Sequence, residues 1–312
     1  MSHDIDRRTF LTGTAALATS VWSTRQLPRR RAGTRLILLG TGGGPRPRKV
    51  RSASAQVIVV NNAAYVIDCG DGVARQLVLA DVPLPRLRGV FITHHHSDHN
   101  ADYGNLLSLA WTAGLQSRVD TWGPPPLERM TSQFFEMNDA DISARIADES
   151  RVPLAPLIHA HDIREGGTVM QDENVKVTCV VVHHPPTVPA FAYRFDTADR
   201  SIVISGDTAP SDDLIRLARG ANVLVHEALY LPGLDRMVAR VPNAPTLKQS
   251  IISHHTSAED AGRIAAAAGV GMLVLSHLVP PDDSMITDEM WTNAARKHFR
   301  GTIVVGRDLL EV

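Results

Sequence analysis

The stretch THHHSDH, residues 93–99, places four imidazoles and one carboxylate within seven positions. Imidazole nitrogen and carboxylate oxygen are ligands that zinc and similar divalent ions accept in proteins. Because side chains alternate along an extended chain, His94 and His96 can point to the same side. A turn after them would bring Asp98 and His99 to a neighbouring position. The stretch therefore predicts two pairs of ligands that face two adjacent metal ions.

One such cluster cannot complete two hydrolytic metal sites, each of which keeps a coordination position for water. Three further candidates follow strand-like runs: His184 in VVVHHPP, Asp207 in ISGDT and His277 in VLSHL. A carboxylate at Asp207 could bridge both ions. The predicted metal ligands are then His94, His96 and His184 on one ion, Asp98, His99 and His277 on the other, and Asp207 on both.

Strand-like and helix-like runs alternate from Arg35 onward and must position these side chains. Period-two and buried apolar patterns predict strands, and apolar residues at helical spacing predict helices. The expected strands are 35–41, 55–60, 63–70, 89–93, 118–123, 175–184, 190–197, 200–207, 221–229 and 271–278, and the expected helices are 71–82, 101–114, 127–149, 212–220, 257–269 and 287–299. Both halves mix strands with helices, which favours an α/β fold with two sheets face to face and helices outside.

Composition limits the classes of function. The chain has 312 residues, 44% of them hydrophobic, which suffices for a substantial core. Its 32 basic and 33 acidic residues nearly cancel, so no global positive field favours nucleic acid. The two cysteines, Cys69 and Cys179, cannot build a disulfide framework or a cysteine-rich zinc module.

The N-terminus has the features of an export signal. Arg7 and Arg8 precede Thr-Phe-Leu and a short, weakly apolar run rich in Ala and Thr, which resembles a twin-arginine signal. We therefore expect a signal and flexible segment at 1–33, a hydrolase domain at 34–312, and a periplasmic location. No apolar segment reaches the roughly 18 residues that span a bilayer, so we expect no stable membrane association after export.

The order of the motifs resembles a known family. LGTGGGP, THHHSDH, HHPP, SGDT and SHL follow one another as they do in the metallo-β-lactamase superfamily. The resemblance implies a four-layer αββα sandwich with a two-metal site along one sheet edge. It also favours His184 over its neighbour His183 as the ligand, because the family's histidine directly precedes the small or proline residue of its motif. The loop GTGGGP is then expected beside the metal cleft.

Three features resemble the branch that holds ribonuclease Z and the metal-dependent arylsulfatases. They are the aspartate Asp98 in the metal cluster, HEA at 226–228, and HHTS at 254–257 before an alanine-rich helix. By this resemblance Glu227 orients His255, and His255 protonates the leaving group. Asp98 would help to hold the attacking hydroxide, so the predicted catalytic residues are His255, Glu227 and Asp98.

These features predict a hydrolase with two divalent ions, most simply Zn²⁺, although the same ligands accept manganese or iron. A hydroxide that bridges the metals would cleave a small anionic ester, either an aryl sulfate or a phosphodiester. Two alternatives stay open: a ribonuclease Z-type endoribonuclease that processes tRNA 3′ ends, and a lactonase. A metal-binding protein without turnover is a further hypothesis, which the predicted Glu227 and His255 pair disfavours.

Ribonuclease Z enzymes grip tRNA with an arm inserted between the third histidine motif and the GDT motif. Here only 22 residues (185–206) separate His184 from Asp207, and two predicted strands use them. We therefore expect tRNA not to be a substrate.

Two longer segments are open in role. Segment 230–253 offers Arg236, Arg240 and Lys248 to an anionic substrate, and segment 123–147 offers Phe134, Phe135 and Met137 as a wall of the cleft. Either segment could equally be surface decoration. A homodimer is also possible.

Overall fold

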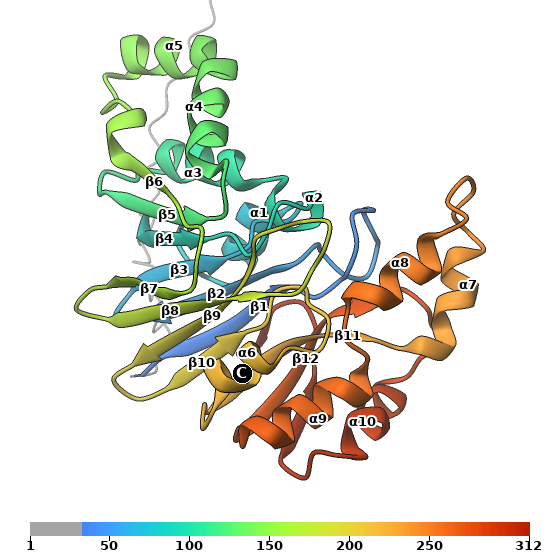
Figure 1. Cartoon of the computed structure of the whole chain (residues 1–312). Coiled ribbons are helices and arrows are strands. Elements are labelled where there is room, and N and C mark those ends of the chain that lie inside the picture. Colours follow the sequence, from blue (N-terminus) through green and yellow to red (C-terminus); the bar gives the residue numbers. More distant parts are fainter. Residues whose placement is uncertain (1–32) are drawn as a thin grey trace, which may run out of the picture. The chain divides into compact units, whose positions relative to one another are not determined.

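Two seven-stranded sheets form the centre of the described part of the chain, residues 33–312 of a computed structural model (Figure 1). In spatial order the first sheet contains β14 (Leu310–Glu311), β1 (Arg35–Gly40), β2 (Ala55–Val60), β3 (Ala63–Ile67), β4 (Leu87–Phe91), β5 (Val119–Gly123) and β6 (Ile158–Asp162). The second contains β13 (Thr302–Val305), β12 (Met272–Val279), β11 (Val223–Leu229), β10 (Ser201–Ile204), β9 (Ala190–Thr197), β8 (Val175–Val182) and β7 (Gly167–Gln171).

Helices cover the outer face of each sheet. The chain forms α1 (Val73–Leu79), α2 (Ser97–Asn100), α3 (Tyr103–Thr112), α4 (Leu127–Met137), α5 (Asp139–Glu149), α6 (Asp212–Ala218), α7 (Leu234–Val238), α8 (Leu247–His254), α9 (Ala258–Ala268) and α10 (Asp288–Arg296). Short 3₁₀ turns lie at Leu84–Arg86, Ala155–Leu157 and Leu231–Gly233. Residues of α1 and α3 pack on the first sheet, and residues of α6, α9 and α10 pack on the second.

Alternating side chains build the layers. In β1, Leu36 and Leu38 belong to the apolar cluster between the two sheets, whereas Ile37 and Leu39 belong to the cluster beneath α1 and α3. A strand buried on both faces must be apolar at every position, which is why RLILLG reads as a continuous run. The three apolar layers separate helix, sheet, sheet and helix, so the predicted α/β fold, a four-layer αββα sandwich, is confirmed.

Local sequence explains several boundaries. Asn61 and Asn62 both adopt positive φ, at 48° and 74°, and form the two-residue turn that joins β2 to β3. Ser257 caps α9 by accepting a hydrogen bond from the Asp260 backbone N–H, and Gly269 ends that helix at φ 63°.

The carboxyl ends of several strands meet at one edge. β3, β4, β5 and β6 run parallel to one another, as do β10, β11, β12 and β13. β8 and β10 are both antiparallel to β9, so β8 has the direction of β10. The residues that follow β4, β8 and β10, and the last residues of β11 and β12, are therefore available to one site.

Some elements differ from the predictions. β6 and β7 were not predicted as strands, and 230–253 was predicted only as an extended segment although it contains α7 and α8. The predicted twin-arginine signal at 1–33 lies outside the described residues except for Gly33. Among the helices of residues 33–312, none combines the length and apolar character that a membrane crossing requires.

Candidate metal centre

The histidine stretch leaves the carboxyl end of β4 and enters the short helix α2. His94 and His96 precede the helix, and Asp98 and His99 lie buried in its single turn. The ring of His95 turns away and meets a backbone carbonyl outside the cluster, at 2.7 Å from its Nε2. The structure thus has the alternation that the sequence predicts.

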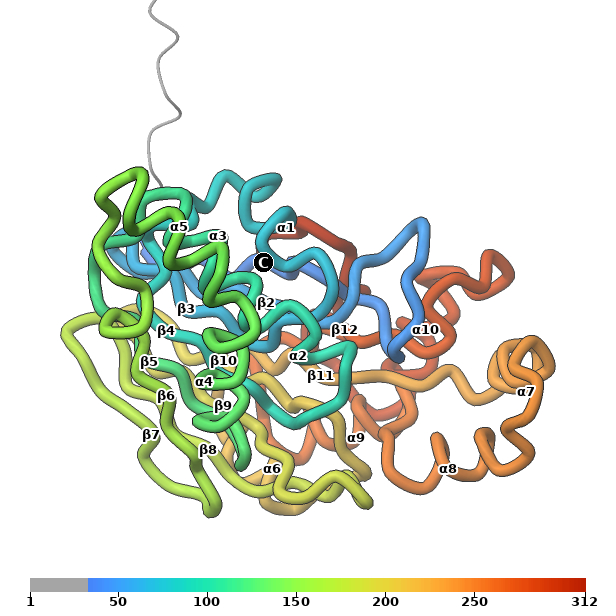
Figure 2. Tube along the Cα trace, turned by 90° about the horizontal axis from the view of Figure 1, so that it is seen from above, coloured from blue at the N-terminus to red at the C-terminus, as the bar shows by residue number. Residues whose placement is uncertain are grey.

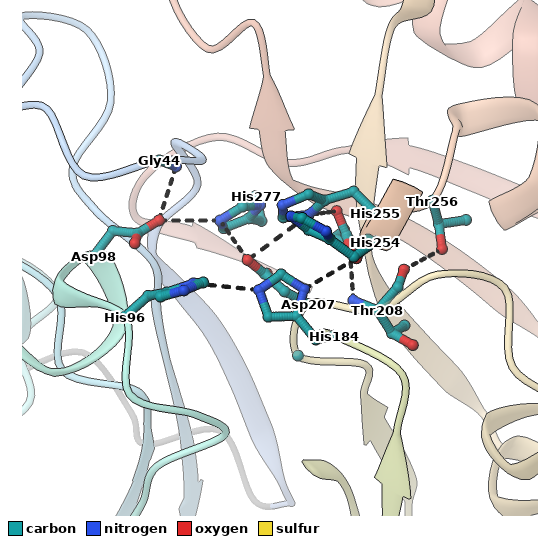
Figure 3. A network of polar contacts seen from close by, with 12 residues as sticks. Gly44, His96, Asp98, His184, Asp207, Thr208, His254, His255, Thr256 and His277 are labelled. Carbon is teal, nitrogen blue, oxygen red and sulfur yellow. Dashed lines mark hydrogen bonds and ion pairs between the residues drawn. The ribbon is translucent and has the colours of Figure 1, made fainter. Parts of the chain in front are cut away.

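The first group of donors brings together His94, His96, His184 and Asp207, with one ligand atom of each within 4.8 Å of the others. Nδ1 of His96 lies 3.0 Å from Nε2 of His94 and 3.2 Å from Nε2 of His184. Oδ2 of Asp207 lies 3.8 Å from Nε2 of His94. Three imidazole nitrogens and one carboxylate oxygen therefore converge on one point, as Figure 3 shows for His96, His184 and Asp207.

The second group contains Asp98, His99 and His277, and an overlapping third contains Asp207, Glu227, His255 and His277. Nε2 of His277 lies 3.2 Å from Oδ2 of Asp98. Oδ2 of Asp207 lies 3.3 Å from Nε2 of His99 and 3.3 Å from Nε2 of His277. Asp207 thus stands between the two groups, where a bridging carboxylate is expected.

The protonation states of His94, His184 and Asp207 fit divalent ions. Burial, and then the neighbouring His99, hold the pKa of His94 well below its ordinary value, and burial lowers the pKa of His184 to about 4. Both rings are therefore neutral and carry a free lone pair at neutral pH. Burial alone would raise the pKa of Asp207, but the facing imidazoles of His277 and His99 lower it by more. The pKa therefore lies well below its ordinary value, and the carboxylate is ionised.

Three buried atoms of the candidate ligands also have no hydrogen-bond partner among residues 33–312: Nε2 of His99, Oδ1 of Asp207 and Nδ1 of His277. A buried polar atom without a partner is costly, because it has lost its hydration. The neutral nitrogens of His94 and His184 and the ionised oxygen of Asp207 converge in a way that suits divalent cations.

Asp68 supports the cluster and was missed by the sequence predictions. Its Oδ2 lies 2.7 Å from Nδ1 of His99, and the Thr93 hydroxyl donates to the same oxygen. That hydroxyl also lies 3.0 Å from Nδ1 of His94. Such outer contacts fix the orientation of a ligating ring. The available signal was a lone carboxylate at the end of β3, the strand beside β4.

The rings of His184 and His96 are held through their outer nitrogens. Nδ1 of His184 lies 2.9 Å from the carbonyl oxygen of His254, and Nε2 of His96 lies 2.8 Å from the Thr187 hydroxyl. His184 is fully buried, whereas His183 is exposed. The structure therefore points His184 into the centre, as the sequence predicts.

His255 and Glu227 form a buried pair beside the centre. Nδ1 of His255 lies 2.8 Å from Oε2 of Glu227, and the Thr208 backbone N–H donates to Oε1 at 2.6 Å. Burial lowers the pKa of His255, but the charge and hydrogen bond of Glu227 outweigh it and raise this pKa to about 9. Nδ1 of His255 is 3.8 Å from Oδ2 of Asp207. A protonated imidazole therefore stands next to the converging ligands.

A cleft of about 380 Å³ opens at the centre and is lined by His96, Asp98, Asp207, His255 and His277. The glycine loop after β1 forms one wall, as predicted, and the Gly44 backbone N–H donates to Asp98 at 2.8 Å. At Gly43, a Cβ would lie 2.7 Å from Nδ1 of His277, so only glycine allows this approach.

The two segments of open role have different outcomes. Segment 230–253 lines the cleft through α7 and α8. Segment 123–147 does not, because Phe134 packs on Gly104 of α3 and Phe135 packs on the core of the first half. Met137 is 76% exposed. The suggestion that these three side chains wall the cleft is therefore wrong.

The cations at the cleft also differ from those suggested by the sequence. Arg236 pairs with Asp283 at 2.7 Å, and Lys248 pairs with Asp235 at 2.6 Å. The lining arginines are instead Arg46 and Arg48 of the glycine loop. Both arginines belong to the motif PRPRK, which directly follows GTGGG, but the sequence predictions did not assign that motif to the substrate.

Comparison with known proteins identifies the family. The family model of the Beta-lactamase superfamily domain matches residues 64–278. The chain belongs to the metallo-β-lactamase superfamily. A relative named Ribonuclease Z, from Mycobacterium sp. (strain KMS), is 32% identical over 279 residues, which cover 89% of this chain and 95% of the relative.

Solved structures agree with the fold. The metallo-β-lactamase fold protein YhfI from Bacillus subtilis has a TM-score of 0.66 at 21% identity, covering 89% of this chain and 98% of YhfI. The short form of human tRNase Z has a TM-score of 0.63 at 21% identity, with the same coverage of both chains.

This member of the superfamily is a metal-dependent hydrolase of ester bonds, in the ribonuclease Z branch. The names of its relatives weigh against the expectation that tRNA is not a substrate. Aryl sulfates and lactones as substrates, and the twin-arginine signal, stay predictions.

Proposed function

We propose that this protein is a two-metal phosphodiesterase of the ribonuclease Z type that cleaves RNA. The observation that carries the proposal is the His255 and Glu227 pair, 2.8 Å apart and next to a complete donor set. A site that only stored metal would need no such pair. The ribonuclease Z relative, aligned over 95% of its length, supports RNA as the first substrate to test.

The proposal assigns two ions, most simply Zn²⁺, to the two donor groups. His94, His96 and His184 would hold one, Asp98, His99 and His277 the other, and Asp207 both. When bound, such a pair of ions ionises water near neutral pH and neutralises charge on the phosphoryl group.

The side chains of this chain supply the proton chemistry. As water attacks phosphorus, the bond to the leaving oxygen breaks and that oxygen needs a proton. His255 holds one and lines the cleft, so it is the general acid, and Glu227 keeps its ring oriented. Asp98, fixed by the Gly44 backbone N–H, would help to orient the attacking water.

The test uses a precursor tRNA with a 3′ trailer and the zinc-loaded protein. We expect a single cut at the trailer junction, and loss of that cut in His255→Ala at unchanged metal content. His298→Ala, at an exposed histidine that pairs with Glu259, is the matched control and keeps full activity. An intact precursor in the presence of wild-type protein contradicts the proposal.

A small anionic ester is the second candidate, and a specific observation favours it. Residues 185–206 are used by β9, β10 and their short connections, so this region holds no inserted arm. A panel of bis(4-nitrophenyl) phosphate, 4-nitrophenyl sulfate and a lactone measures this candidate against the tRNA. Fast turnover of a small ester with an uncut precursor would replace RNA as the substrate.

Location and assembly are proposals separate from the substrate. The Arg7-Arg8 motif supports delivery to the periplasm by the twin-arginine route. Cell fractionation of the wild type and of Arg7→Lys/Arg8→Lys tests it, and equal fractionation of both contradicts it. A homodimer stays a prediction, which analytical ultracentrifugation tests.

A further inference from the structure

The cleft beside the metal centre has two unlike walls. The loop after β1 contributes the guanidinium groups of Arg46 and Arg48. Arg48 is partly buried, and its Nη1 donates to the carbonyl oxygens of Gly44 at 2.9 Å and Arg46 at 2.6 Å, which holds it against the loop. This wall is cationic and suits an anion at the centre.

The second wall is apolar and comes from α7, α8 and the chain between them. Leu247 and Ile251 both line the cleft and stand four residues apart, so they share one face of α8. Met237 and Ile251 also pack against a small buried cluster that contains Val279. The wall is therefore fixed in place by a core of its own.

This wall adjoins the proton donor. α8 ends at His254, and His255 follows as its C-terminal cap. Ile251 thus lies about one helical turn before the imidazole that faces the leaving oxygen. Figure 3 shows His254 and His255 over the donor cluster, and Figure 2 shows α7 and α8 projecting from the sheets on this side. A group attached to the leaving oxygen would lie against the apolar wall.

We propose that the wall formed by Met237, Val241, Leu247 and Ile251 binds a flat apolar ring carried on the leaving group of the phosphodiester. The ring is either the aryl group of a small ester or the base of the nucleoside whose 3′ oxygen leaves. The inference rests on the proposed function and adds a specificity determinant to it. Ring burial supplies affinity in proportion to the apolar area removed from water.

Neighbouring isoleucines give a matched pair of variants. Ile251 lines the cleft, whereas Ile252 is 45% exposed and does not line it. With ethyl 4-nitrophenyl phosphate, we expect Ile251→Asn to raise KM about tenfold at similar kcat, and Ile252→Asn to change KM less than about twofold. Leu247→Asn, at a position outside the small core under the wall, repeats the result if Ile251→Asn is unstable.

A second arm distinguishes the two sources of the ring. Short RNAs with either a base or an abasic sugar on the leaving side of the cut are compared. Loss of the base raises KM in the wild type but not in Leu247→Asn if the ring is a nucleobase. A KM effect confined to the aryl ester assigns the cleft to small esters. Equal KM values for the lining and control variants in both arms overturn the inference.

Binding without turnover separates this inference from the proposed function. The zinc-loaded wild type should bind phenylphosphonate about tenfold more tightly than methylphosphonate, and Leu247→Asn should lose that preference. Such a preference in a protein that cleaves neither substrate refutes the phosphodiesterase but keeps the ring site. Equal binding of both phosphonates refutes the ring site, whatever the activity.

Discussion

The two helical extensions of the molecule, α4 with α5 and α7 with α8, stand well apart in both views: α4 and α5 rise above the sheets in Figure 1, whereas α7 and α8 lie to their right in Figures 1 and 2. Both are amphipathic additions to the sandwich, but they differ in what lies beneath them. α4 and α5 place Phe135 and Ile146 on the core of the first half. α7 and α8 cover a small apolar cluster and turn further apolar side chains to the metal centre.

The difference shows that apolar content does not reveal which extension serves a site. Phe134 and Phe135 looked suitable for a substrate, yet the first sheet and α3 take them up. An extension lines the site when the chain that follows it enters the site. α8 leads directly into His255, whereas α5 leads to Ser150 and a loop that ends at β6.

Removal of the metals should have the largest effect, and it should affect the two extensions differently. Chelation should abolish activity and lower amide-exchange protection at residues 94–99 and 247–255, because the His184 ring that binds the His254 carbonyl loses its restraint. Residues 127–149 should keep their protection. Hydrogen exchange with mass spectrometry measures both regions, and equal loss in both would break the comparison.

His255→Ala should lower kcat by about 10² to 10⁴, the usual contribution of a general acid. Metal content should not change, since neither predicted set of ligands includes His255. Arg145→Ala on α5, whose partners are Asp141 and Glu149, should leave kcat within about twofold. Steady-state kinetics and metal analysis test the pair, and a similar loss in both variants would contradict the assignment.

Arg48→Gln should raise KM for an anionic ester about tenfold, because it removes a positive charge from the wall of the cleft. Lys248→Gln should have little effect, since Asp235 already pairs with that ammonium group. The KM of both variants for bis(4-nitrophenyl) phosphate decides which cations meet the substrate. The reverse order would return the anion site to the segment first suggested by the sequence.

Phe135→Ala should affect stability and spare catalysis. Its ring packs on the first core, so its removal should lower the free energy of unfolding by about 2 kcal/mol. kcat and KM should stay at wild-type values below the new Tm. Thermal unfolding and kinetics on one sample test this, and a raised KM would mean that α4 reaches the substrate after all.

Glu227→Gln should shift a pH profile. The charge of Glu227 raises the pKa of His255 to about 9, so the acid form of His255 persists through neutral pH and is lost as the pH rises through that value. Without the carboxylate, burial lowers this pKa, and the alkaline limb of kcat should move to lower pH. An unchanged alkaline limb would assign it to a different group.

The sequence predicts secondary structure best where adjacent residues alone determine it. The buried strand at 35–41 and the helix at 257–269 each depend on adjacent residues. The order of the motifs then predicted that His184, Asp207 and His277 would meet the cluster at 94–99, and the structure brings them together.

The sequence predictions were wrong or incomplete where the role of a residue depends on partners elsewhere in the chain. Arg236 and Lys248 looked available, but Asp283 and Asp235 neutralise them. α7 and α8 are short and stand among prolines such as Pro242 and Pro245, so helical periodicity could not appear in 230–253. Asp68 carried no recognisable pattern, because its importance arises only from its contact with His99.

The candidate ligands come from both sheets, and this division affects how fast the protein unfolds. The segment after β4 of the first sheet contributes four of them, and the second sheet contributes one each after β8, after β10 and within β12. Both cysteines are free, so no disulfide joins the two halves. A cation bound by ligands from both sheets would link the two halves. The unfolding rate should therefore fall as zinc concentration rises.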